Sequence, residues 1–493
     1  MLDAHSGAAD LLFTNLPRIQ VTVVGDLMVD HYLWGDVRRI SPEAPVPVVR
    51  LQRSTHSPGG AANVAANLAS LGVHTCLAGV TGSDRAREDL LAAIHGIDTR
   101  GIIAAGDRLT CVKTRVMSGH QQLLRVDHED NTPIGEHAAN ALGERVVSTV
   151  QDSDALLLSD YAKGTLTDLL TQRLIRAARA QNKLVIVDPK GNDFLRYRGA
   201  TAITPNRAEL ALATGCPTED LDALYNAAHG LRDQLELDFV LLTLSEHGLA
   251  LIEPQGTTSI PAAAREVFDV SGAGDTVIAV FTAALCCGLS RTDAAHIANL
   301  AAGAVVAQAG TATLTSDELS TALHEESTHE QAAKISTAPA LARRIADWRR
   351  RGERVVFTNG CFDLLHAGHV NYLEQARHQG DRLVVGINTD NSVRALKGPE
   401  RPIIREADRA RVLAALAAVD AVVLFDAPTP LDLITTLRPD VLVKGADYTE
   451  DGVVGAAEVR SWGGTVVLVP LTEQRSTSSI VRKINNPNVD AAS

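Results

Sequence analysis

The stretch Asp269-Val270-Ser271-Gly272-Ala273-Gly274-Asp275-Thr276 runs directly into an apolar segment that starts at Val277 and is predicted to be helical. Small residues let the backbone N–H groups of residues 272–274 converge on an anion at the start of that helix. Such a site can hold the negative charge that develops on a transferring phosphoryl group, and Asp275 beside it could accept a proton from an attacking hydroxyl. The alternative is a plain helix start, with glycine in a turn and aspartate near the N-cap.

Short apolar runs elsewhere in the chain predict buried strands. The predicted strands are Gln20–Val24, Ala155–Leu158, Leu184–Val187, Phe239–Leu242, Arg354–Phe357, Arg382–Gly386, Ala421–Leu424, Val441–Val443 and Thr465–Val469. Most are separated by segments with helical spacing, such as Leu166–Ala180 and Arg409–Val419. This alternation predicts an α/β fold with parallel sheets covered by helices on both faces. Ligands of such sheets bind beyond the carboxyl ends of the strands, so residues that directly follow a strand are candidates for a site.

The length of 493 residues exceeds one ordinary domain and predicts two or three. The stretch from Ser316 to Ala338 is polar and contains no apolar strand, whereas a basic helix is predicted at Leu341–Arg350 with a new strand after it. We therefore predict a first domain at residues 1–328, a linker at 329–338 and a second domain at 339–493.

Composition excludes several classes of protein. The net charge of −13 argues against a general nucleic-acid binder, because phosphate backbones require clustered Lys and Arg. The six cysteines form no CxxC pair, so neither a zinc site nor a redox motif is indicated, and they suit a reducing compartment. The N-terminus lacks a signal-peptide pattern, and the apolar stretch Val277–Cys287 is too short to span a bilayer. We expect a soluble, cytoplasmic protein that binds neither nucleic acid nor membrane.

Three further features of the first domain lie after predicted strands or before predicted helices. Asp26 and Asp30 follow the first strand, where a carboxylate could bind sugar hydroxyls. Gly59-Gly60-Ala61-Ala62-Asn63 opens an Ala-rich helix, and Thr204-Pro205-Asn206 with Glu209 follows a strand-like segment. Each feature alone is typical of a turn or a solvated face. Together, and in this order with residues 269–276, they resemble the ribokinase-like (PfkB) sugar kinases.

The resemblance implies a ribokinase-like fold with a small β-lid, Mg²⁺ as cofactor and a role for each motif. The insertions at Asp30–Pro58 and Leu109–Val126 could build the lid, and because related kinases often dimerise through it, we expect a homodimer. The implied residues are Asp275 as catalytic base; Gly272, Ala273 and Gly274 as anion hole; Asp30, Gly59, Gly60 and Asn63 for the sugar; and Asn206, Glu209 (reaching Mg²⁺ through water), Thr243 and Gly248 for ATP.

Three segments narrow the resemblance to the heptose-phosphate kinase branch: Arg39–Val48, Leu158–Gly164 and Asp188–Gly191. Lys163 and Lys190 suit phosphates, one on the sugar and the other on ATP. The sequence does not distinguish the two roles, and we assign Lys163 to the sugar phosphate and Lys190 to ATP. Arg115 and Arg125 are further candidates for the phosphate of the sugar, although either could instead be a surface arginine.

A second decisive stretch is Thr358-Asn359-Gly360-Cys361-Phe362-Asp363-Leu364-Leu365-His366-Ala367-Gly368-His369, which follows a predicted strand and opens a helix. His366 and His369 are three residues apart, so they share one face and can form a pocket for ATP phosphates with the helix N-terminus. Capping histidines or a metal pair are the alternatives. The string resembles the HxGH cytidylyltransferase-like family, whose members transfer a nucleotidyl group and release pyrophosphate.

That resemblance implies a Rossmann-like nucleotidyltransferase domain. Lys444, after a predicted strand, would neutralise the triphosphate beside the catalytic His366 and His369, and the Ser/Thr-rich run Arg475–Ile480 would hold its β- and γ-phosphates. The implied ATP-binding residues are Asn359, Phe362, His366, His369, Asp390, Arg409, Thr477 and Ser478. No side-chain base is needed, because the attacking sugar phosphate oxygen is already anionic, and positioning, Mg²⁺ and the cations supply the catalysis.

The two resemblances cover nearly the whole chain, and together they look like the bifunctional enzymes of ADP-heptose synthesis. By that resemblance, the first domain uses ATP to phosphorylate C1 of D-glycero-β-D-manno-heptose 7-phosphate, and a separate phosphatase removes the 7-phosphate. The second domain then makes ADP-heptose, which usually feeds the lipopolysaccharide core. One alternative is a different sugar phosphate or nucleoside triphosphate. The other is a sugar-phosphate-binding regulator, which would need the loss of catalytic groups that are present here.

Overall fold

The computed structural model describes residues 2–119, 121–263, 272–307, 313–446, 449 and 452–470. The chain divides into two compact units that meet along the sequence at Leu323 and His324. Helix α10 (Ser316–Lys334) runs through this point and occupies the first part of the stretch predicted as a linker, residues 329–338. Helix α11 (Ala338–Arg350) then includes the predicted basic helix. None of the helices among the described residues is long and apolar enough to cross a membrane.

The first unit is built on a nine-stranded sheet with the order β13-β12-β11-β10-β9-β8-β1-β4-β5. Strands β1 to β11 of this sheet pair in parallel, and the hairpin of β12 and β13 adds two antiparallel strands at one edge. The strands predicted for this unit are all confirmed. Their bounds are β1 (Gln20–Gly25), β4 (His74–Thr81), β5 (Ile97–Ala104), β8 (Ala155–Ser159), β9 (Leu184–Asp188), β10 (Ala202–Ile203), β11 (Phe239–Thr243), β12 (Leu249–Glu253) and β13 (Gly256–Ile260).

Helices cover both faces of this sheet because its central strands are apolar on both sides. One core contains Val21, Val23 and Leu157, and the other contains Val24 and Leu158. The first core is closed by α1 (Leu2–Asn15), α2 (Ala61–Ser70), α3 (Arg85–Ala93), α8 (Ala273–Cys286) and α9 (Arg291–Val306). The second is closed by α4 (Glu136–Val150), α5 (Asp168–Arg179), α6 (Arg207–Thr214) and α7 (Leu221–Gln234).

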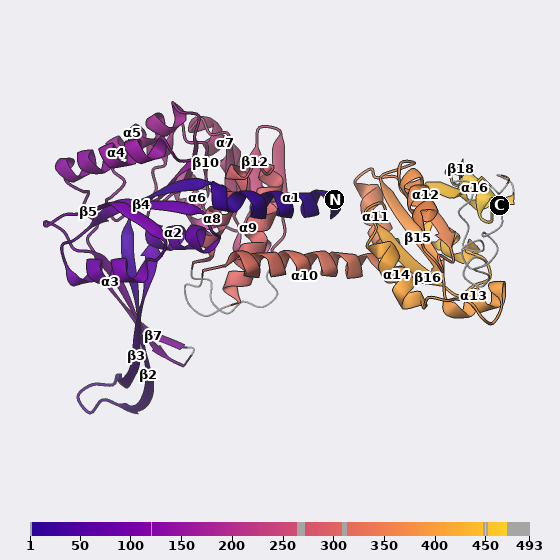
Figure 1. Cartoon of the computed structure of the whole chain (residues 1–493), viewed down its shortest axis with the longest axis horizontal. Helices are drawn as coiled ribbons and strands as arrows, with labels where there is room; N and C mark the ends of the chain where they lie inside the picture. The colour runs from indigo at the N-terminus through magenta and orange to yellow at the C-terminus, as the bar shows by residue number, and fades with distance from the viewer. Residues whose placement is uncertain are drawn as a thin grey trace, which may run out of the picture. The chain divides into compact units, whose positions relative to one another are not determined.

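A separate four-stranded sheet forms the predicted lid, with the order β3-β2-β6-β7. Its strands are β2 (Leu27–Ile40), β3 (Pro47–Gly60), β6 (Cys111–Ser118) and β7 (Gln121–His128), and Figure 1 shows β2, β3 and β7 extending from one side of the unit. Register aligns Asp30 of β2 with Lys113 of β6, which in turn aligns with Asp127 of β7. Because aligned residues point to the same side of a sheet, these three side chains share one face.

The second unit contains a five-stranded parallel sheet with the order β16-β15-β14-β17-β18. The strands are β14 (Val355–Gly360), β15 (Arg382–Asn388), β16 (Ala421–Phe425), β17 (Val441–Gly445) and β18 (Thr465–Val469), as predicted. One face is covered by α11, α15 (Leu431–Leu437) and α16 (Ala456–Ser461), and the other by α12 (Ala367–Arg377) and α14 (Glu406–Ala414). The strand order reverses at β14, so this Rossmann-like sheet has its ligand crevice at the carboxyl ends of β14 and β17.

One predicted helix has different bounds in the structure. The apolar spacing predicted a helix at Arg409–Val419, whereas α14 begins at Glu406 and ends at Ala414. The chain after α14 forms turns, in which the N–H groups of Leu416 and Val419 bond to carbonyls three residues earlier. Val419 is fully buried in the core, so its apolar character reflects packing before β16 and not a longer helix.

Candidate active sites

The carboxylate of Asp275 lies in the first turn of α8, which begins just after Gly272. Gly272 caps the helix with a φ of 81°, a left-handed conformation that glycine adopts without strain. Residues 273 and 274 of the predicted anion hole follow it in the first turn, where backbone N–H groups have no partner within the helix. The preceding residues Asp269 to Ser271 of the motif lie outside the described residues.

Two donors from distant parts of the sequence hold the carboxylate of Asp275. Its Oδ2 accepts a hydrogen bond from the Asn63 amide at 2.6 Å, and its Oδ1 accepts one from the Tyr161 hydroxyl at 2.5 Å. Desolvation raises the pKa of Asp275 to about 6, against these two hydrogen bonds, which lower it. The negative charge of Asp30 raises this pKa further, and the positive charge of Lys113 lowers it. Asp275 therefore has the basicity that a proton acceptor needs at neutral pH.

The glycines at the end of β3 let the lid reach this site. A Cβ on Gly59 would lie 2.8 Å from Oδ2 of Asp30, and one on Gly60, whose φ is 58°, would lie 2.5 Å from the carbonyl oxygen of Asp26. The chain then enters α2, where the Oδ1 atom of Asn63 is buried and accepts no hydrogen bond from any described residue. The structure therefore brings four sugar-site residues predicted from the sequence, including Asn63, to one place beside Asp275.

Asp26 has a different role from the one its sequence position suggested. Its buried carboxylate accepts hydrogen bonds from the backbone N–H groups of Tyr161 (2.9 Å), Lys163 (2.9 Å) and Thr165 (3.0 Å). Three such bonds use the oxygens that were expected to face sugar hydroxyls. Asp26 therefore shapes the loop after β8, and this loop delivers the hydroxyl of Tyr161 to Asp275.

Three cations predicted for the sugar phosphate are each paired with a carboxylate. Arg115 pairs with Asp30, and its guanidinium lies over the ring of Tyr32. The other two pairs are Arg125 with Asp127 at 2.8 Å and Lys163 with Glu129 at 2.8 Å. Arg115 and Arg125 are aligned on β6 and β7, so both lie on the lid face that carries Asp30. Neither is an isolated surface arginine.

The predicted ATP residues of this unit gather at the ends of β9, β10 and β11. Asn206 and Glu209 form a capping box at the start of α6, and the other oxygen of Glu209 pairs with Lys190 at 2.7 Å. Thr243 bridges to Asn206, and a Cβ on Gly248 would lie 2.1 Å from the carbonyl oxygen of Ile260. This turn therefore needs glycine and stands next to the capping box.

Sequence reasoning missed Asp188, Tyr161 and Lys113. Burial raises the pKa of Asp188 well above its usual value, and the negative charges of Glu209 and Asp275 add to this effect. Asp188 and Tyr161 lie at or just after the ends of predicted strands, so the rule that ligands bind beyond strand ends would have found them. Lys113 carries no such signal, because its position depends on how the lid strands pair.

A cavity of about 730 Å³ lies beside the loop after β8. Asp160, Ala162 and Gly164 line it together with residues of α4 and α5, whereas Asp275 does not. Asp160 is buried there and accepts a hydrogen bond from the Tyr197 hydroxyl at 2.7 Å. None of the residues predicted for catalysis or binding lines this cavity, so it is distinct from the site around Asp275.

In the second unit, the two histidines of the HxGH string stand at the start of α12. His366 is the N-cap residue, and its ring stacks on that of His369 with the centroids 3.9 Å apart. The ring of Phe362 meets His369 edge-on at 5.3 Å. Burial lowers the pKa of His369 to about 4, helped by the neighbouring His366 and Lys397, so His369 is neutral at pH 7. Its buried Nδ1 has no hydrogen-bond partner among the described residues.

Lys444 and Asn359 meet at the crevice where the strand order reverses. Lys444 lies in β17, and its ammonium donates a hydrogen bond to the backbone carbonyl of Asn359 in β14 at 3.0 Å. The side-chain oxygen of Asn359 is buried and accepts no hydrogen bond from the part of the chain that the structure describes. The cation of Lys444 suits the anionic oxygens of a polyphosphate, whereas the side-chain oxygen of Asn359 can only accept a hydrogen bond from a donor group. Thr477 and Ser478 of the run Arg475–Ile480 lie outside the described residues.

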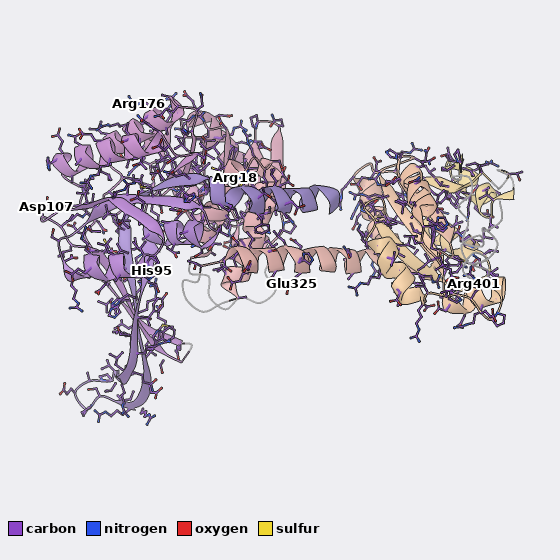
Figure 2. All side chains as sticks on the ribbon, in the orientation of Figure 1. Arg18, His95, Asp107, Arg176, Glu325 and Arg401 are labelled. Carbon is purple, nitrogen blue, oxygen red and sulfur yellow. The ribbon has the colours of Figure 1, made fainter. Side chains whose placement is uncertain are left out.

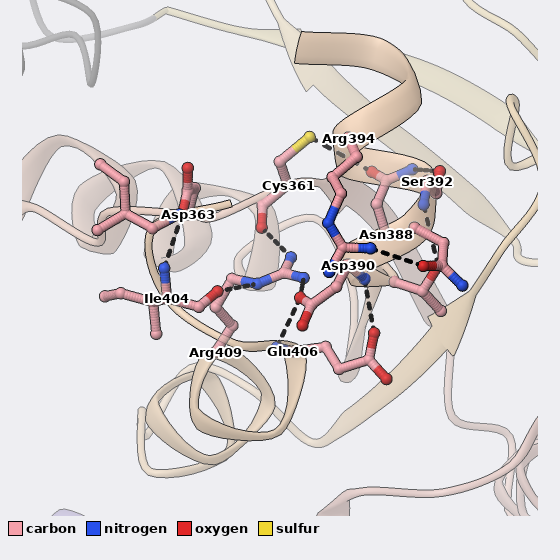
Figure 3. A network of polar contacts seen from close by, with 12 residues as sticks. Cys361, Asp363, Asn388, Asp390, Ser392, Arg394, Ile404, Glu406 and Arg409 are labelled. Carbon is pink, nitrogen blue, oxygen red and sulfur yellow. Dashed lines mark hydrogen bonds and ion pairs between the residues drawn. The ribbon is translucent and has the colours of Figure 1, made fainter. Parts of the chain in front are cut away.

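Asp390 and Arg409 form a network behind the HxGH loop (Figure 3). The guanidinium of Arg409 is buried and donates to the carbonyls of Ile404 (3.0 Å) and Cys361 (2.6 Å) and to Asp390 (2.8 Å). The backbone N–H of Asp390 donates to the carboxylate of Glu406 at 2.6 Å, and the backbone N–H of Glu406 donates to the carboxylate of Asp390 at 2.8 Å. These contacts indicate that Arg409 positions the loop, and its predicted contact with ATP stays a prediction.

Comparison with known proteins shows the family of each unit. Residues 18–318 match the pfkB family of carbohydrate kinases, and residues 357–484 match the cytidylyltransferase-like family. Proteins named Bifunctional protein HldE are 56% identical in Magnetococcus marinus, with 94% of this chain and 97% of that protein covered, and 51% identical in Koribacter versatilis, with 97% and 99% covered. The chain belongs to the family of bifunctional HldE proteins. It therefore combines a sugar kinase and a nucleotidyltransferase.

Solved structures support the fold of the first unit. Arabidopsis thaliana ribokinase complexed with ribose and ATP has a TM-score of 0.51 and 21% identity, covering 62% of this chain and 98% of that one. Escherichia coli phosphofructokinase-2 in complex with potassium has a TM-score of 0.53 and 19% identity, with the same coverage. At these identities the likeness shows a ribokinase-like fold, which confirms the fold expected from the motifs.

The raised pKa of Asp275 predicts the acid limit of the kinase reaction. An aspartate base must be ionised, so kcat/KM should fall about tenfold per pH unit below a pH of about 6 and be constant just above it. The profile of kcat/KM against pH, measured with saturating ATP, checks this. An acid limb near the ordinary aspartate value of 3.8 would contradict the environment described for Asp275.

Single substitutions should separate the two activities. Asp275→Asn should lower the kinase rate by about 10²–10⁴-fold, because the base is lost, while the nucleotidyl transfer continues. His369→Ala should lower nucleotidyl transfer by about 10²-fold or more, because a donor in the phosphate pocket is lost, while the kinase continues. His378→Ala at the exposed end of α12 is the matched control for the second change. Loss of both activities from either substitution would refute independent sites.

Proposed function

We propose that the chain catalyses two reactions of ADP-heptose synthesis. The first unit uses ATP to phosphorylate C1 of D-glycero-β-D-manno-heptose 7-phosphate, and the second transfers the adenylyl group of ATP to heptose 1-phosphate and releases pyrophosphate. The observation that carries this proposal is the presence of both complete motifs in one chain, Asp275 behind its glycines and His366 with His369 after β14. A cytoplasmic location, where ATP is supplied, belongs to the same proposal.

In the kinase reaction, Asp275 accepts the proton of the C1 hydroxyl as its oxygen attacks the γ-phosphorus of ATP. A new O–P bond forms, the bond to the bridging oxygen breaks, and ADP leaves. The backbone N–H groups at residues 272–274 stabilise the charge that develops on the phosphoryl oxygens. Asn63 and Tyr161 orient the base, and the side-chain oxygen of Asn63 is placed to accept a hydrogen bond from the sugar.

The residues around Asp188 and Glu209 fit a Mg²⁺ ion that comes with ATP. Burial raises the pKa of Asp188 most, and the negative charge of Glu209 raises it further, which is a charge that a divalent cation would neutralise. Carboxylates together with substrate phosphates and waters are the ligands that Mg²⁺ takes in kinases. Bound there, the ion would neutralise charge on the β- and γ-phosphates. In this arrangement Glu209 also keeps Lys190 in place to contact the nucleotide.

In the second reaction, an oxygen of heptose 1-phosphate attacks the α-phosphorus of ATP, and pyrophosphate leaves as the α–β bridge breaks. The attacking oxygen is anionic, so no base is required. His366, His369 and Lys444 stand where the triphosphate would lie, and the neutral imidazole of His369 donates a hydrogen bond without a charge of its own. The buried acceptor of Asn359 can select a donor group on the nucleotide.

Phosphorus NMR with the purified protein tests the substrate. With D-glycero-D-manno-heptose 7-phosphate, ATP and Mg²⁺, we expect a new C1 phosphate signal together with ADP. Addition of a phosphatase that removes the 7-phosphate should then yield a sugar nucleotide and pyrophosphate. The Asp275→Asn variant is the control that should give neither signal. Intact ATP in the wild-type sample would refute heptose 7-phosphate as the substrate. A preference for CTP or GTP in the second step would refute ATP as the nucleotide donor.

We also propose that the chain forms a homodimer through the lid. Leu124 and Val126 of β7 share the lid face opposite Asp30, and Leu124 is 57% exposed. Ile40, Val46 and Leu51 at the far part of the lid are exposed as well. Burial of such side chains against a second copy would stabilise a dimer, because each removes apolar surface from water.

Leu124→Asp should convert the dimer to a monomer of 52.3 kDa in analytical ultracentrifugation, because a charge would be buried in the interface. Leu169→Asp is the matched control, since Leu169 is 88% exposed on α5 and outside the lid. A wild-type protein that sediments as a monomer at micromolar concentration would refute the dimer.

A further inference from the structure

The charges on the inner face of the lid do not cancel completely. We define this face by the aligned residues of β2, β6 and β7 that include Asp30, Lys113 and Asp127. Arg115 neutralises Asp30, and Arg125 neutralises Asp127. Lys113 lies between the same two carboxylates in register, yet no carboxylate among the described residues is within ion-pair distance of its ammonium. Among the described cations that β6 and β7 contribute to this face, Lys113 therefore has no ion-pair partner.

That charge is held over the residue that contacts the catalytic base. The ammonium of Lys113 lies 5.6 Å from the centroid of the Tyr161 ring, and the hydroxyl of the same ring donates to Asp275. The ammonium is close enough to Asp275 to influence its ionisation. The ammonium therefore lies over the face of the ring whose hydroxyl contacts the base. A sugar with its reacting hydroxyl at Asp275 would bind close to Lys113, and a phosphate group on that sugar could reach the ammonium.

We propose that Lys113 binds the phosphate group that the sugar already carries, and that it makes the kinase select a phosphorylated sugar. This inference rests on the proposed kinase function and names the residue that recognises its substrate class. A phosphate dianion gains more from an uncompensated cation than from one that already serves a carboxylate. Arg115, Arg125 and Lys163 must exchange an existing ion pair before they can contribute, whereas Lys113 only leaves the face of an aromatic ring.

The test compares two substrates that differ only in the phosphate, heptose 7-phosphate and heptose. Lys113→Met keeps the length of the side chain and removes the charge. It should raise KM for the phosphorylated sugar by about 10-fold to 100-fold, with kcat changed much less, and should leave KM for the unphosphorylated sugar unchanged. Lys113→Arg, which keeps a cation, should restore most of the affinity. Arg176→Met is the matched control, because Arg176 is an exposed cation of α5 far from the lid strands in the sequence (Figure 2).

Two outcomes would overturn the role of Lys113. An equal rise of KM for both sugars would show that Lys113 contacts the sugar itself and not its phosphate. A fall of kcat with KM unchanged would show that Lys113 acts on the phosphoryl group that is being transferred. Failure of the kinase function itself is distinguishable, because the wild-type enzyme would then phosphorylate neither sugar. If the wild type preferred a different sugar phosphate, the assignment of heptose as the substrate would be wrong. The same comparison with that sugar phosphate and its unphosphorylated form would then decide the role of Lys113.

Discussion

The kinase unit depends on the enclosed carboxylate of Asp275, because its two hydrogen bonds join segments that are far apart in the sequence. Asn63 comes from α2 behind the lid strand β3, and Tyr161 comes from the loop after β8. Removing a carboxylate from water is costly, and the two donors offset part of that cost. The residual cost appears as the raised pKa of Asp275, because burial raises this pKa more than the two hydrogen bonds lower it.

Each unit uses a second buried charge to fix the loop that carries its reactive groups. In the first unit the anion of Asp26 accepts three backbone N–H groups, and in the second the cation of Arg409 donates to two carbonyls and to Asp390. Backbone N–H and C=O groups in a loop after a parallel strand have no partners in the sheet. A buried anion can hold such a loop by its N–H groups, and a buried cation can hold it by its carbonyls. The sequence predicted both residues as ligand-binding residues, yet in the structure each forms hydrogen bonds to the backbone of the loop that carries the reactive groups.

This difference explains which parts of the molecule sequence could predict. The apolar strands and the glycine-rich and HxGH strings depend on local residues, and the structure has them where they were predicted. The roles of Asp26 and Arg409 depend on loops that meet only after folding. Lys113 could not be singled out, since its lack of a carboxylate partner follows from the pairing of β2, β6 and β7 and from competition between neighbouring ion pairs. The shorter α14 shows the same limit, because burial of Val419 continues the apolar pattern beyond the end of the helix.

The two sites differ in charge because their nucleophiles differ in charge. A sugar hydroxyl is neutral and must lose a proton, so the first site needs a carboxylate whose pKa lies near the working pH, and Asp275 meets this need at about 6. A phosphate oxygen that acts as the nucleophile is already anionic, has no proton to lose, and would be repelled by a carboxylate beside it. The second site accordingly has Lys444 and a histidine pair in front, with the pKa of His369 lowered to about 4, and its acidic residues Asp390 and Asp363 are paired with Arg409 and Arg401 behind the loop. The acids and bases of each unit therefore fit its reaction. The first site has a base because its nucleophile must lose a proton, and the second has none because its nucleophile is already ionised.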